Sequence, residues 1–338
     1  MSFTFHNLRS GVAAASSDEQ FTHAVLEGLS MQPKRLPSWL IFDDQGSEIF
    51  TEITQLPGYH PAHCEVEIFQ VHQQAITDLL AGSEFRIIEL GAGDGGKTQV
   101  LLESWIQRQL TFEYVPIDIS DGAIKTLVAN LESQFSQGTM SVTGLAADYF
   151  DGLGTISKQD SIRNFVLFLG STIGNMELPA AKSFVQKLRD SLNVGDYVMI
   201  GFDLMKSPKV LYTAYNDATG VFERFNLHLL DVLNQKLGAN FKKDQYVQQG
   251  QYNPTTHAVE SMIYSTREQV VTIQALEKEV FFGAWEAMQT EHSYKYTLAE
   301  IELLATQAGC RVVRPRPGRC GLSCRRRLRA ALPRSTPP

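Results

Sequence analysis

The feature that most constrains this chain is a regular alternation of apolar and amphipathic segments between residues 65 and 202. Five short apolar runs have the length and the bounding turns of buried strands: 85–90, 112–117, 140–145, 164–169 and 197–202. Segments with apolar residues at helical spacing separate most of them, at 65–80, 97–109, 121–134 and 179–192. This alternation predicts an α/β fold, in which a parallel Rossmann-like sheet carries helices on both faces. Ligands of such sheets bind outside the carboxyl ends of the strands.

The alternation stops after residue 205. Segment 210–243 has apolar residues at helical spacing, while 261–271 and 280–282 have the composition of antiparallel strands. At the other end of the chain, 1–33 reads as a helical lead-in and 36–63 as loop and short helix. The change of pattern predicts a second, smaller α+β unit.

A glycine-rich loop, ELGAGDGGK at residues 89–97, joins the first strand to its helix. Glycines let the backbone turn tightly and approach a ligand closely, and the helix that follows favours anionic groups. Such a loop is a weak signal alone, but acids follow the next two strands. Asp118 can accept from ribose hydroxyls, and Asp148 from an adenine amino group beside the flat ring of Tyr149.

The acidic residues around the loop separate two cofactor classes. Glu89 and Asp94 crowd a loop that a dinucleotide site keeps neutral for pyrophosphate. They favour a ligand with an ammonium and a sulfonium group, so the sequence predicts S-adenosylmethionine as the cofactor. The alternative from another class is a nucleotide-dependent dehydrogenase, which titration with NAD would reveal.

Charge and composition exclude several other classes. The net charge is −7, but residues 311–338 hold nine arginines and no Asp, Glu or Lys, which leaves 21 basic and 37 acidic residues before them, a net charge of −16. An acidic body argues against nucleic acid as a partner. We find no apolar run long enough for a membrane span and no secretory signal, and four cysteines make no disulfide framework, so we expect a cytoplasmic protein. His60, His63 and Cys64 lack further ligands at metal spacing, and we expect no metal site.

The sequence resembles the histidine-specific Nα-methyltransferases of the ergothioneine pathway, which make trimethylated histidine (hercynine) with S-adenosylmethionine. The similarity runs from about residue 36 to residue 310. It is carried by FDDQGSEIF at 42–50, LPGY at 56–59, the glycine loop, VPID at 115–118, FLGSTIGN at 168–175, AYNDATGV at 214–221 and TEHS at 290–293. The resemblance implies a class I methyltransferase domain, 64–205 plus 296–338, with a substrate-binding domain, 1–63 plus 206–295.

The resemblance also implies roles for single residues. Cofactor contacts fall to the glycine loop and the strand ends, at Glu89, Gly91, Gly93, Lys97, Asp118, Asp148 and Tyr149. The acceptor's amino and carboxylate ends fall to Tyr59, Asn175 and Tyr215, of which Tyr59 and Asn175 serve the transfer itself. Its imidazole falls to Glu291 and Ser293.

Physical chemistry agrees with these roles. A model α-amino group has a pKa of about 7.7–8.0, and a phenol and an amide can hold the free amine without adding charge. The Glu291 carboxylate favours a ring that is cationic or that donates an N–H, and it is left unpaired against an apolar ring. Two departures bear on the acceptor: Ser261 stands where some family members have methionine, with Met262 next to it, and Phe42 replaces a tyrosine.

The predicted function is therefore histidine Nα-methylation in three steps, with a small amino acid as the partner. The sequence leaves the oligomeric state undetermined, and a monomer is one of the possibilities. Two alternatives within reach of the same residues are an Nα-methyltransferase for another amino acid, such as a tryptophan derivative, and a non-catalytic S-adenosylmethionine-binding protein. The arginine-rich end does not resemble the apolar hairpin that closes such folds. We interpret it as an out-of-frame reading of the gene's end, which resequencing tests.

Overall fold

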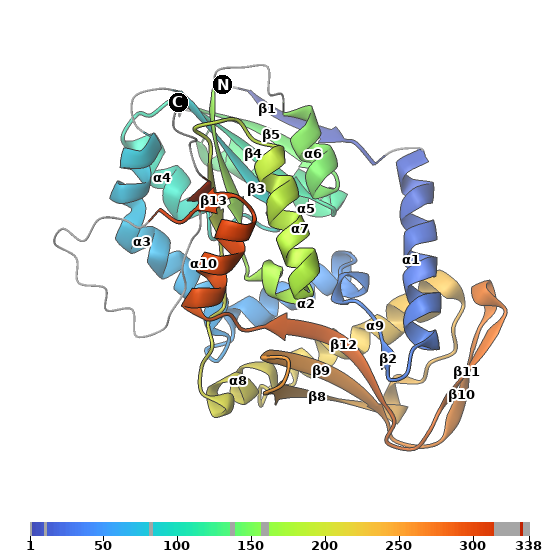
Figure 1. The fold of residues 1–338 in the computed structure, drawn as a ribbon. Coiled ribbons are helices and arrows are strands. Elements are labelled where there is room, and N and C mark those ends of the chain that lie inside the picture. The colour runs from blue at the N-terminus through green and yellow to red at the C-terminus, as the bar shows by residue number, and fades with distance from the viewer. Residues whose placement is uncertain are drawn as a thin grey trace. The chain divides into compact units, whose positions relative to one another are not determined.

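The structure, a computed structural model, describes residues 2–9, 12–80, 84–135, 139–156, 162–313 and 332–333 (Figure 1). It divides the chain into two compact units. The first comprises Met1–Arg9, Pro61–Leu204 and Tyr296–Pro338, and the second Ser10–His60 and Met205–Lys295. Each unit thus gathers segments that are far apart in the sequence. Most of the arginine-rich end, for which we predicted a frame error, lies outside the described residues.

The core of the first unit is a six-stranded parallel sheet in the order β1-β5-β4-β3-β6-β7. Its strands are β1 (Phe3–Asn7), β3 (Phe85–Leu90), β4 (Phe112–Asp118), β5 (Met140–Ala146), β6 (Arg163–Phe168) and β7 (Tyr197–Ile200). Leu90 is in register with Ile117 and with Phe168, so neighbouring strands end at one edge. The strand order reverses between β3 and β6, which is where open α/β sheets bind ligands. The predicted Rossmann-like parallel sheet is confirmed.

Helices cover both faces of this sheet. They are α3 (His60–Leu80), α4 (Gln99–Gln107), α5 (Asp121–Phe135), α6 (Tyr149–Thr155), α7 (Leu178–Asp190) and α10 (Leu298–Gln307). Apolar residues of α3, α4 and α5, among them Phe69 and Trp105, share one buried cluster with the sheet. On the other face, the ring of Phe184 in α7 lies 4.6 Å from that of Phe168 in β6. Burial on both faces explains why these strands are continuous apolar runs.

The helical prediction for 1–33 is wrong at its beginning. Phe3–Asn7 forms β1, which pairs in parallel with β5, and only α1 (Val12–Ser30) is helical. Phe3 and Phe5 alternate along the strand and pack against the core cluster. A five-residue strand offers too little of a two-residue period to separate it from the helix that follows.

The second unit is built on a four-stranded sheet in the order β2-β12-β9-β8. Its strands are β2 (Lys34–Arg35), β8 (Tyr246–Asn253), β9 (Ala258–Ser265) and β12 (Ala287–Tyr294), and β10 (Gln269–Ile273) and β11 (Lys278–Phe282) form a separate hairpin. Its helices are α1, α2 (Asp44–Gln55), α8 (Pro208–Tyr215) and α9 (Val221–Leu237). Short 3-10 turns lie at η1 (Ser38–Ile41), η3 (Lys243–Gln245) and η4 (Gln274–Leu276). Helices and mostly antiparallel strands form this unit, with β2 parallel to β12. The run 261–271 is broken into two strands, and β8 and β12 were not predicted.

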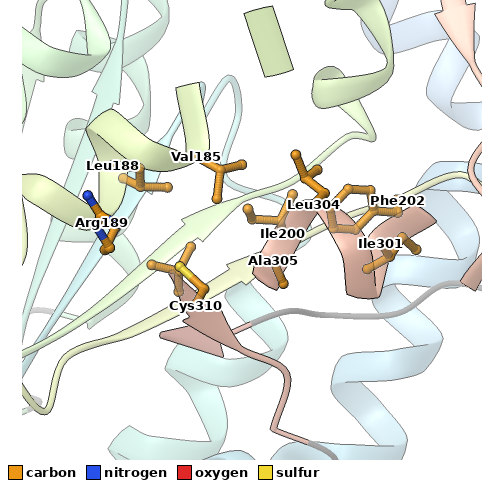
Figure 2. A pocket seen from close by; sticks show the side chains of 10 residues that line it. Val185, Leu188, Arg189, Ile200, Phe202, Ile301, Leu304, Ala305 and Cys310 are labelled. Atoms are coloured by element: carbon orange, nitrogen blue, oxygen red, sulfur yellow. The ribbon is translucent and has the colours of Figure 1, made fainter. Parts of the chain in front are cut away.

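An apolar cavity of about 20 Å³ lies within the first unit, between α7, β7 and α10 (Figure 2). Val185, Ile200 and Leu304 point into it, and Cys310 of the short strand β13 (Cys310–Arg311) borders it. Backbone of β14 (Leu332–Pro333) pairs with β13. None of the predicted site residues lines this cavity, so it belongs to the packing of the fold.

The described residues include neither a helix suited to a membrane nor a cluster suited to a metal ion. None of the helices in that part of the chain has the length and apolarity that crossing a membrane needs. Nor do its His, Cys, Asp and Glu side chains come together in groups of three or more that could hold a metal ion.

Candidate functional site

The glycine loop crosses the end of β4 with a backbone that only glycine adopts readily. Gly91, Gly93 and Gly95 have φ angles of +72°, +54° and +70°. The Gly91 and Ala92 amides donate to the carbonyl oxygen of Ile117 at 2.8 and 3.2 Å. The loop is thereby held against the strand end, with its backbone open to close approach.

Asp118 is held by this loop in a fixed orientation. One carboxylate oxygen accepts from the Gly93 amide at 3.0 Å, and the other from the Ser120 amide at 2.9 Å. A carboxylate with two backbone donors keeps its remaining lone pairs in a defined direction. The side chain is therefore prepared to accept from hydroxyls of a ligand at the sheet edge.

The next strand end carries Asp148 and Tyr149. Asp148 begins α6 as its N-cap and accepts from the Phe150 amide at 3.0 Å. A Cβ atom on Gly91 would lie 3.2 Å from the Tyr149 hydroxyl, so the ring reaches the glycine loop. Burial, with Asp118 and Asp148 nearby, raises the pKa of Tyr149 well above its ordinary value, and the phenol stays neutral.

Glu89 is a buried acidic residue of β3. The Tyr114 phenol donates to its Oε2 at 2.5 Å. Burial raises the pKa of Glu89 to about 7, although the Tyr114 hydrogen bond and the Lys97 ammonium act in the opposite direction. This carboxyl group therefore titrates near neutral pH.

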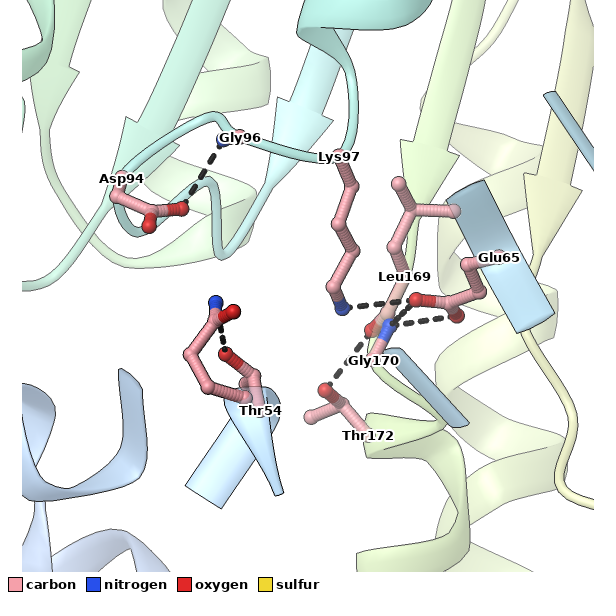
Figure 3. Close-up of polar contacts among 9 residues, drawn as sticks. Thr54, Glu65, Asp94, Gly96, Lys97, Leu169, Gly170 and Thr172 are labelled. Atoms are coloured by element: carbon pink, nitrogen blue, oxygen red, sulfur yellow. Dashed lines mark hydrogen bonds and ion pairs between the residues drawn. The ribbon is translucent and has the colours of Figure 1, made fainter. Parts of the chain in front are cut away.

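Lys97 closes the glycine loop and pairs with a residue that the sequence analysis missed. Its Nζ lies 2.7 Å from Oε2 of Glu65, a buried residue of α3 (Figure 3). The same carboxylate accepts from the Gly170 amide at 2.8 and 3.0 Å. Glu65 therefore ties the loop after β3 to the loop after β6, and its partner Lys97 stays partly exposed.

Asn175 is the other predicted residue on this edge. It ends η2 (Thr172–Asn175), a 3-10 turn that follows β6, and is half-buried. Ser171 precedes the turn in the left-handed region, with φ at +56°. The turn presents the Asn175 amide from the first unit, beyond the tip of β6.

In the second unit, Tyr215 is held in place by its neighbours. The Asn216 side chain exchanges two hydrogen bonds of 2.9 Å with the backbone of Gly250 in β8. A Cβ on Gly250 would lie 2.8 Å from the Tyr215 Cβ, so this close approach requires glycine. Burial opposes ionisation of Asp217, but its hydrogen bonds to Thr219 and to backbone amides of α9 prevail and lower its pKa.

Tyr59 and Tyr215 share an aromatic wall. Their ring centroids are 6.3 Å apart, and Phe222 lies 5.6 Å from Tyr59 and 5.2 Å from Tyr215. Both tyrosines are buried. Phe42 packs at 5.3 Å against Phe50, so the ring that replaces the family tyrosine takes part in the same cluster.

Polar side chains from β12 and its surroundings form a second cluster in this unit. Tyr215 donates to Ser293 Oγ at 2.8 Å, and the buried Lys295 ammonium donates to Tyr215 Oη at 2.7 Å and to Ser293 Oγ at 2.6 Å. Ser261 donates to Glu291 Oε2 at 3.4 Å. Burial raises the pKa of Glu291, opposed by the Lys295 charge and the Ser261 hydroxyl.

A β-bulge at Thr290 sets the direction of these side chains. Gln289 is opposite Met262 and Glu291 is opposite Ser261, so one residue of β12 is extra at this point. The Thr290 hydroxyl donates to Asn226 Oδ1 at 2.6 Å. Bulges re-aim the residues that follow, and here Glu291 and Ser293 follow.

The predicted residues thus form two sets. The first unit holds Glu89, Gly91, Gly93, Lys97, Asp118, Asp148, Tyr149 and Asn175, and the second holds Tyr59, Tyr215, Glu291 and Ser293. Sequence reasoning missed Glu65 and Lys295. Glu291 and Ser293 alternate along β12, and Lys295 continues this spacing directly after the strand, which is a signal that could have found Lys295.

The chain is similar to proteins of known activity. The sequence profile of a family described as histidine-specific, SAM-dependent methyltransferases matches residues 21–315. A histidine N-alpha-methyltransferase of Mycolicibacterium smegmatis is 32% identical over 305 residues, which are 90% of this chain and 93% of that protein. One of Mycobacterium tuberculosis is 30% identical, over 86% and 88% of the two chains. The 4-dimethylallyltryptophan N-methyltransferase easF of Claviceps purpurea is 28% identical over 59% of each chain.

Proposed function

Since this chain belongs to the histidine-specific, S-adenosylmethionine-dependent methyltransferases, we propose that it methylates the α-amino nitrogen of histidine three times to form hercynine. The observation that carries the choice of acceptor is the buried cluster of Glu291, Ser293 and Lys295, which brings a carboxyl group together with hydroxyl and ammonium donors. A small amino acid is then the partner. On the low cysteine content we place the reaction in the cytoplasm.

The first unit fits the cofactor. The positive φ angles of the glycine loop leave its backbone accessible, and the fixed Asp118 carboxylate suits a ribose. Lys97 suits a carboxylate and remains partly exposed beside Glu65. When bound, S-adenosylmethionine supplies a methyl group on a positively charged sulfur. We assign the cofactor to the first unit, which also holds Asn175, and the other acceptor contacts to the second unit.

The acceptor's amine needs a neutral surrounding. A free amine is the nucleophile, so Tyr59 and Asn175, which carry no charge, would orient it without stabilising its protonated form. The amine that gains a methyl group becomes an ammonium and must release a proton to solvent before the next transfer. The third transfer gives a quaternary ammonium, which has no proton to lose, and the series ends there.

The experiment is an incubation of the full chain with methyl-labelled S-adenosylmethionine and each amino acid in turn. The expected result is label in histidine alone, with products heavier by one, two and three CH₂ groups. A product that stops at one CH₂ would contradict the three-step series. The controls are the Glu291→Ala variant and enzyme without acceptor.

The same experiment separates the alternatives. Label in a tryptophan derivative would indicate an acceptor like that in the name of the easF relative. It would contradict the role proposed for the buried Glu291. Tight binding of S-adenosylmethionine without any labelled product would indicate a non-catalytic protein. Binding of NAD in its place would indicate a dehydrogenase.

A further inference from the structure

We propose that Lys295 is a positioning residue that fixes the hydrogen-bond polarity of the acceptor site, so that the site takes the imidazole in its neutral form. Ser293 then meets the ring as a donor only, and Glu291 meets it as an acceptor only. This inference rests on the proposed function and adds the ring's charge state and the residue that enforces it.

The position of Lys295 is unusual for a lysine. Its side chain has 0% exposure, and it follows directly after β12. Its Nζ lies 2.7 Å from Tyr215 Oη, 2.6 Å from Ser293 Oγ and 4.8 Å from the centroid of the Tyr215 ring. A buried ammonium is costly unless it is hydrogen-bonded, and here two hydroxyl oxygens meet it.

The direction of each hydrogen bond follows from what the groups can do. An ammonium has protons and no lone pair, so Tyr215 and Ser293 must both accept from Lys295. The Tyr215 proton is donated to Ser293 Oγ at 2.8 Å. Ser293 Oγ thus accepts two hydrogen bonds, which uses both lone pairs of a hydroxyl, while its own proton is used by neither partner. Toward a ligand, Ser293 can only donate.

Glu291 has the opposite polarity. It precedes Ser293 by two residues on the same strand, and an ionised carboxylate only accepts. Burial raises the pKa of Glu291, and the charge of Lys295 acts against this and favours the ionised form. Titratable groups that face Lys295 include Tyr215 from α8 and Glu291 from β12, while Ser261 from β9 adds a hydroxyl to the cluster.

One donor and one acceptor match a neutral imidazole. The neutral ring has one N–H and one bare nitrogen, whereas the cationic ring has two N–H groups and no lone pair. A cationic ring would place an N–H against the Ser293 proton and bring a second positive charge near Lys295. The cluster therefore selects the neutral ring.

The test compares histidine with 1,2,4-triazole-3-alanine, whose ring stays neutral near pH 7. Both compounds share the amino and carboxylate groups. The KM for histidine divided by the KM for the triazole analogue therefore isolates the protonation of the imidazole. With a ring pKa near 6.5, this ratio should rise about tenfold between pH 7.5 and 5.5 in the unaltered enzyme. In Lys295→Met the hydroxyl of Ser293 regains a lone pair, so the ratio should rise less than about threefold and the KM for histidine should increase more than kcat falls.

Three further variants keep the test decisive. Lys295→Arg retains the charge and the donors, so most of the rise in the KM ratio between pH 7.5 and 5.5 should remain. Ser293→Ala removes the donor with little change in volume and should flatten the ratio even if Lys295→Met fails to fold. Lys236→Met, at an exposed lysine of α9, should behave as the unaltered enzyme.

The outcomes are distinct. If the unaltered enzyme shows no turnover of histidine, the proposed function fails and this inference with it. If it turns histidine over but its own ratio is flat with pH, or Ser293→Ala keeps the full tenfold rise, the inference alone is overturned.

Discussion

Replacing Glu65 by glutamine should destabilise the first unit and weaken cofactor binding. The Glu65 side chain is 3% exposed and receives hydrogen bonds from Lys97 Nζ at 2.7 Å and from the Gly170 amide at 2.8 and 3.0 Å. Glutamine keeps one acceptor oxygen, but its NH₂ group must face one of these two donors. A Cβ on Gly201 would lie 2.1 Å from Glu65 Oε1, so little space exists for the amide to turn away.

The magnitude follows from the lost pair. Removing one member of a buried ion pair costs about 3–5 kcal/mol, and a single charged hydrogen bond is worth about 1.5–3 kcal/mol. The Lys97 side chain is 24% exposed and can reach water, so the range for a single charged hydrogen bond applies. The expected loss in the free energy of unfolding is about 2 kcal/mol. Displaced Lys97 should also raise the Kd for S-adenosylmethionine by about tenfold.

A matched control exists on the surface. Glu52 pairs with Arg224, and their side chains are 53% and 49% exposed. The same change there, Glu52→Gln, should cost less than about 1 kcal/mol. Urea unfolding followed by circular dichroism measures both variants, and calorimetry gives the Kd. Equal losses of stability in the two variants, or an unchanged Kd in Glu65→Gln, would refute this reasoning.

Three other perturbations have defined outcomes. The pKa of Glu89 is raised to about 7, so the folded chain keeps a proton that the unfolded chain loses above pH 4.5. The free energy of unfolding should fall by up to about 3 kcal/mol as the pH rises from 4.5 to about 7. Urea unfolding of Glu89→Gln should show no such dependence on pH. Glu291→Ala should lower kcat/KM for histidine by about 100-fold with an unchanged Kd for S-adenosylmethionine; unchanged turnover would contradict the ring assignment. Gly91→Ala forces φ of +72° on an alanine and crowds the Tyr149 hydroxyl, so the Kd for the cofactor should rise about tenfold. The control is Gly154→Ala, where an added Cβ meets no atom within 4 Å and the Kd should stay unchanged.

The positions of the strand-end residues in the first unit could be predicted because they depend on local order along the chain. Strands that alternate with helices must be parallel, and parallel strands end at one edge, so the residues after each apolar run meet there. Asp118 and Asp148 were placed in this way, and the positive φ angles of Gly91 and Gly93 agree with the reason given for the glycine loop.

Two strands of the second unit resisted prediction for a physical reason. Strands β8 and β12 were missed because the alternating positions that should be apolar carry polar residues, among them Glu291 and Ser293. Polar side chains at buried positions of β12 remove the period on which strand prediction depends. Glu65 was missed because its partner Lys97 lies 32 positions along the chain. Lys295 bonds to Tyr215, 80 positions away, but also to Ser293 two positions away, so only its local alternation with Glu291 and Ser293 could have indicated it.

The two lysines show how one chemical group serves two roles. Lys97 and Lys295 are both held by oxygens of the protein, but the Lys97 side chain is 24% exposed and Lys295 is fully buried. Lys97 can therefore touch a ligand while Glu65 holds it in place. Lys295 acts on a ligand through the hydroxyls of Tyr215 and Ser293, whose proton directions it determines. Loss of Lys97 should accordingly weaken cofactor binding directly, whereas loss of Lys295 should change which form of the acceptor is recognised.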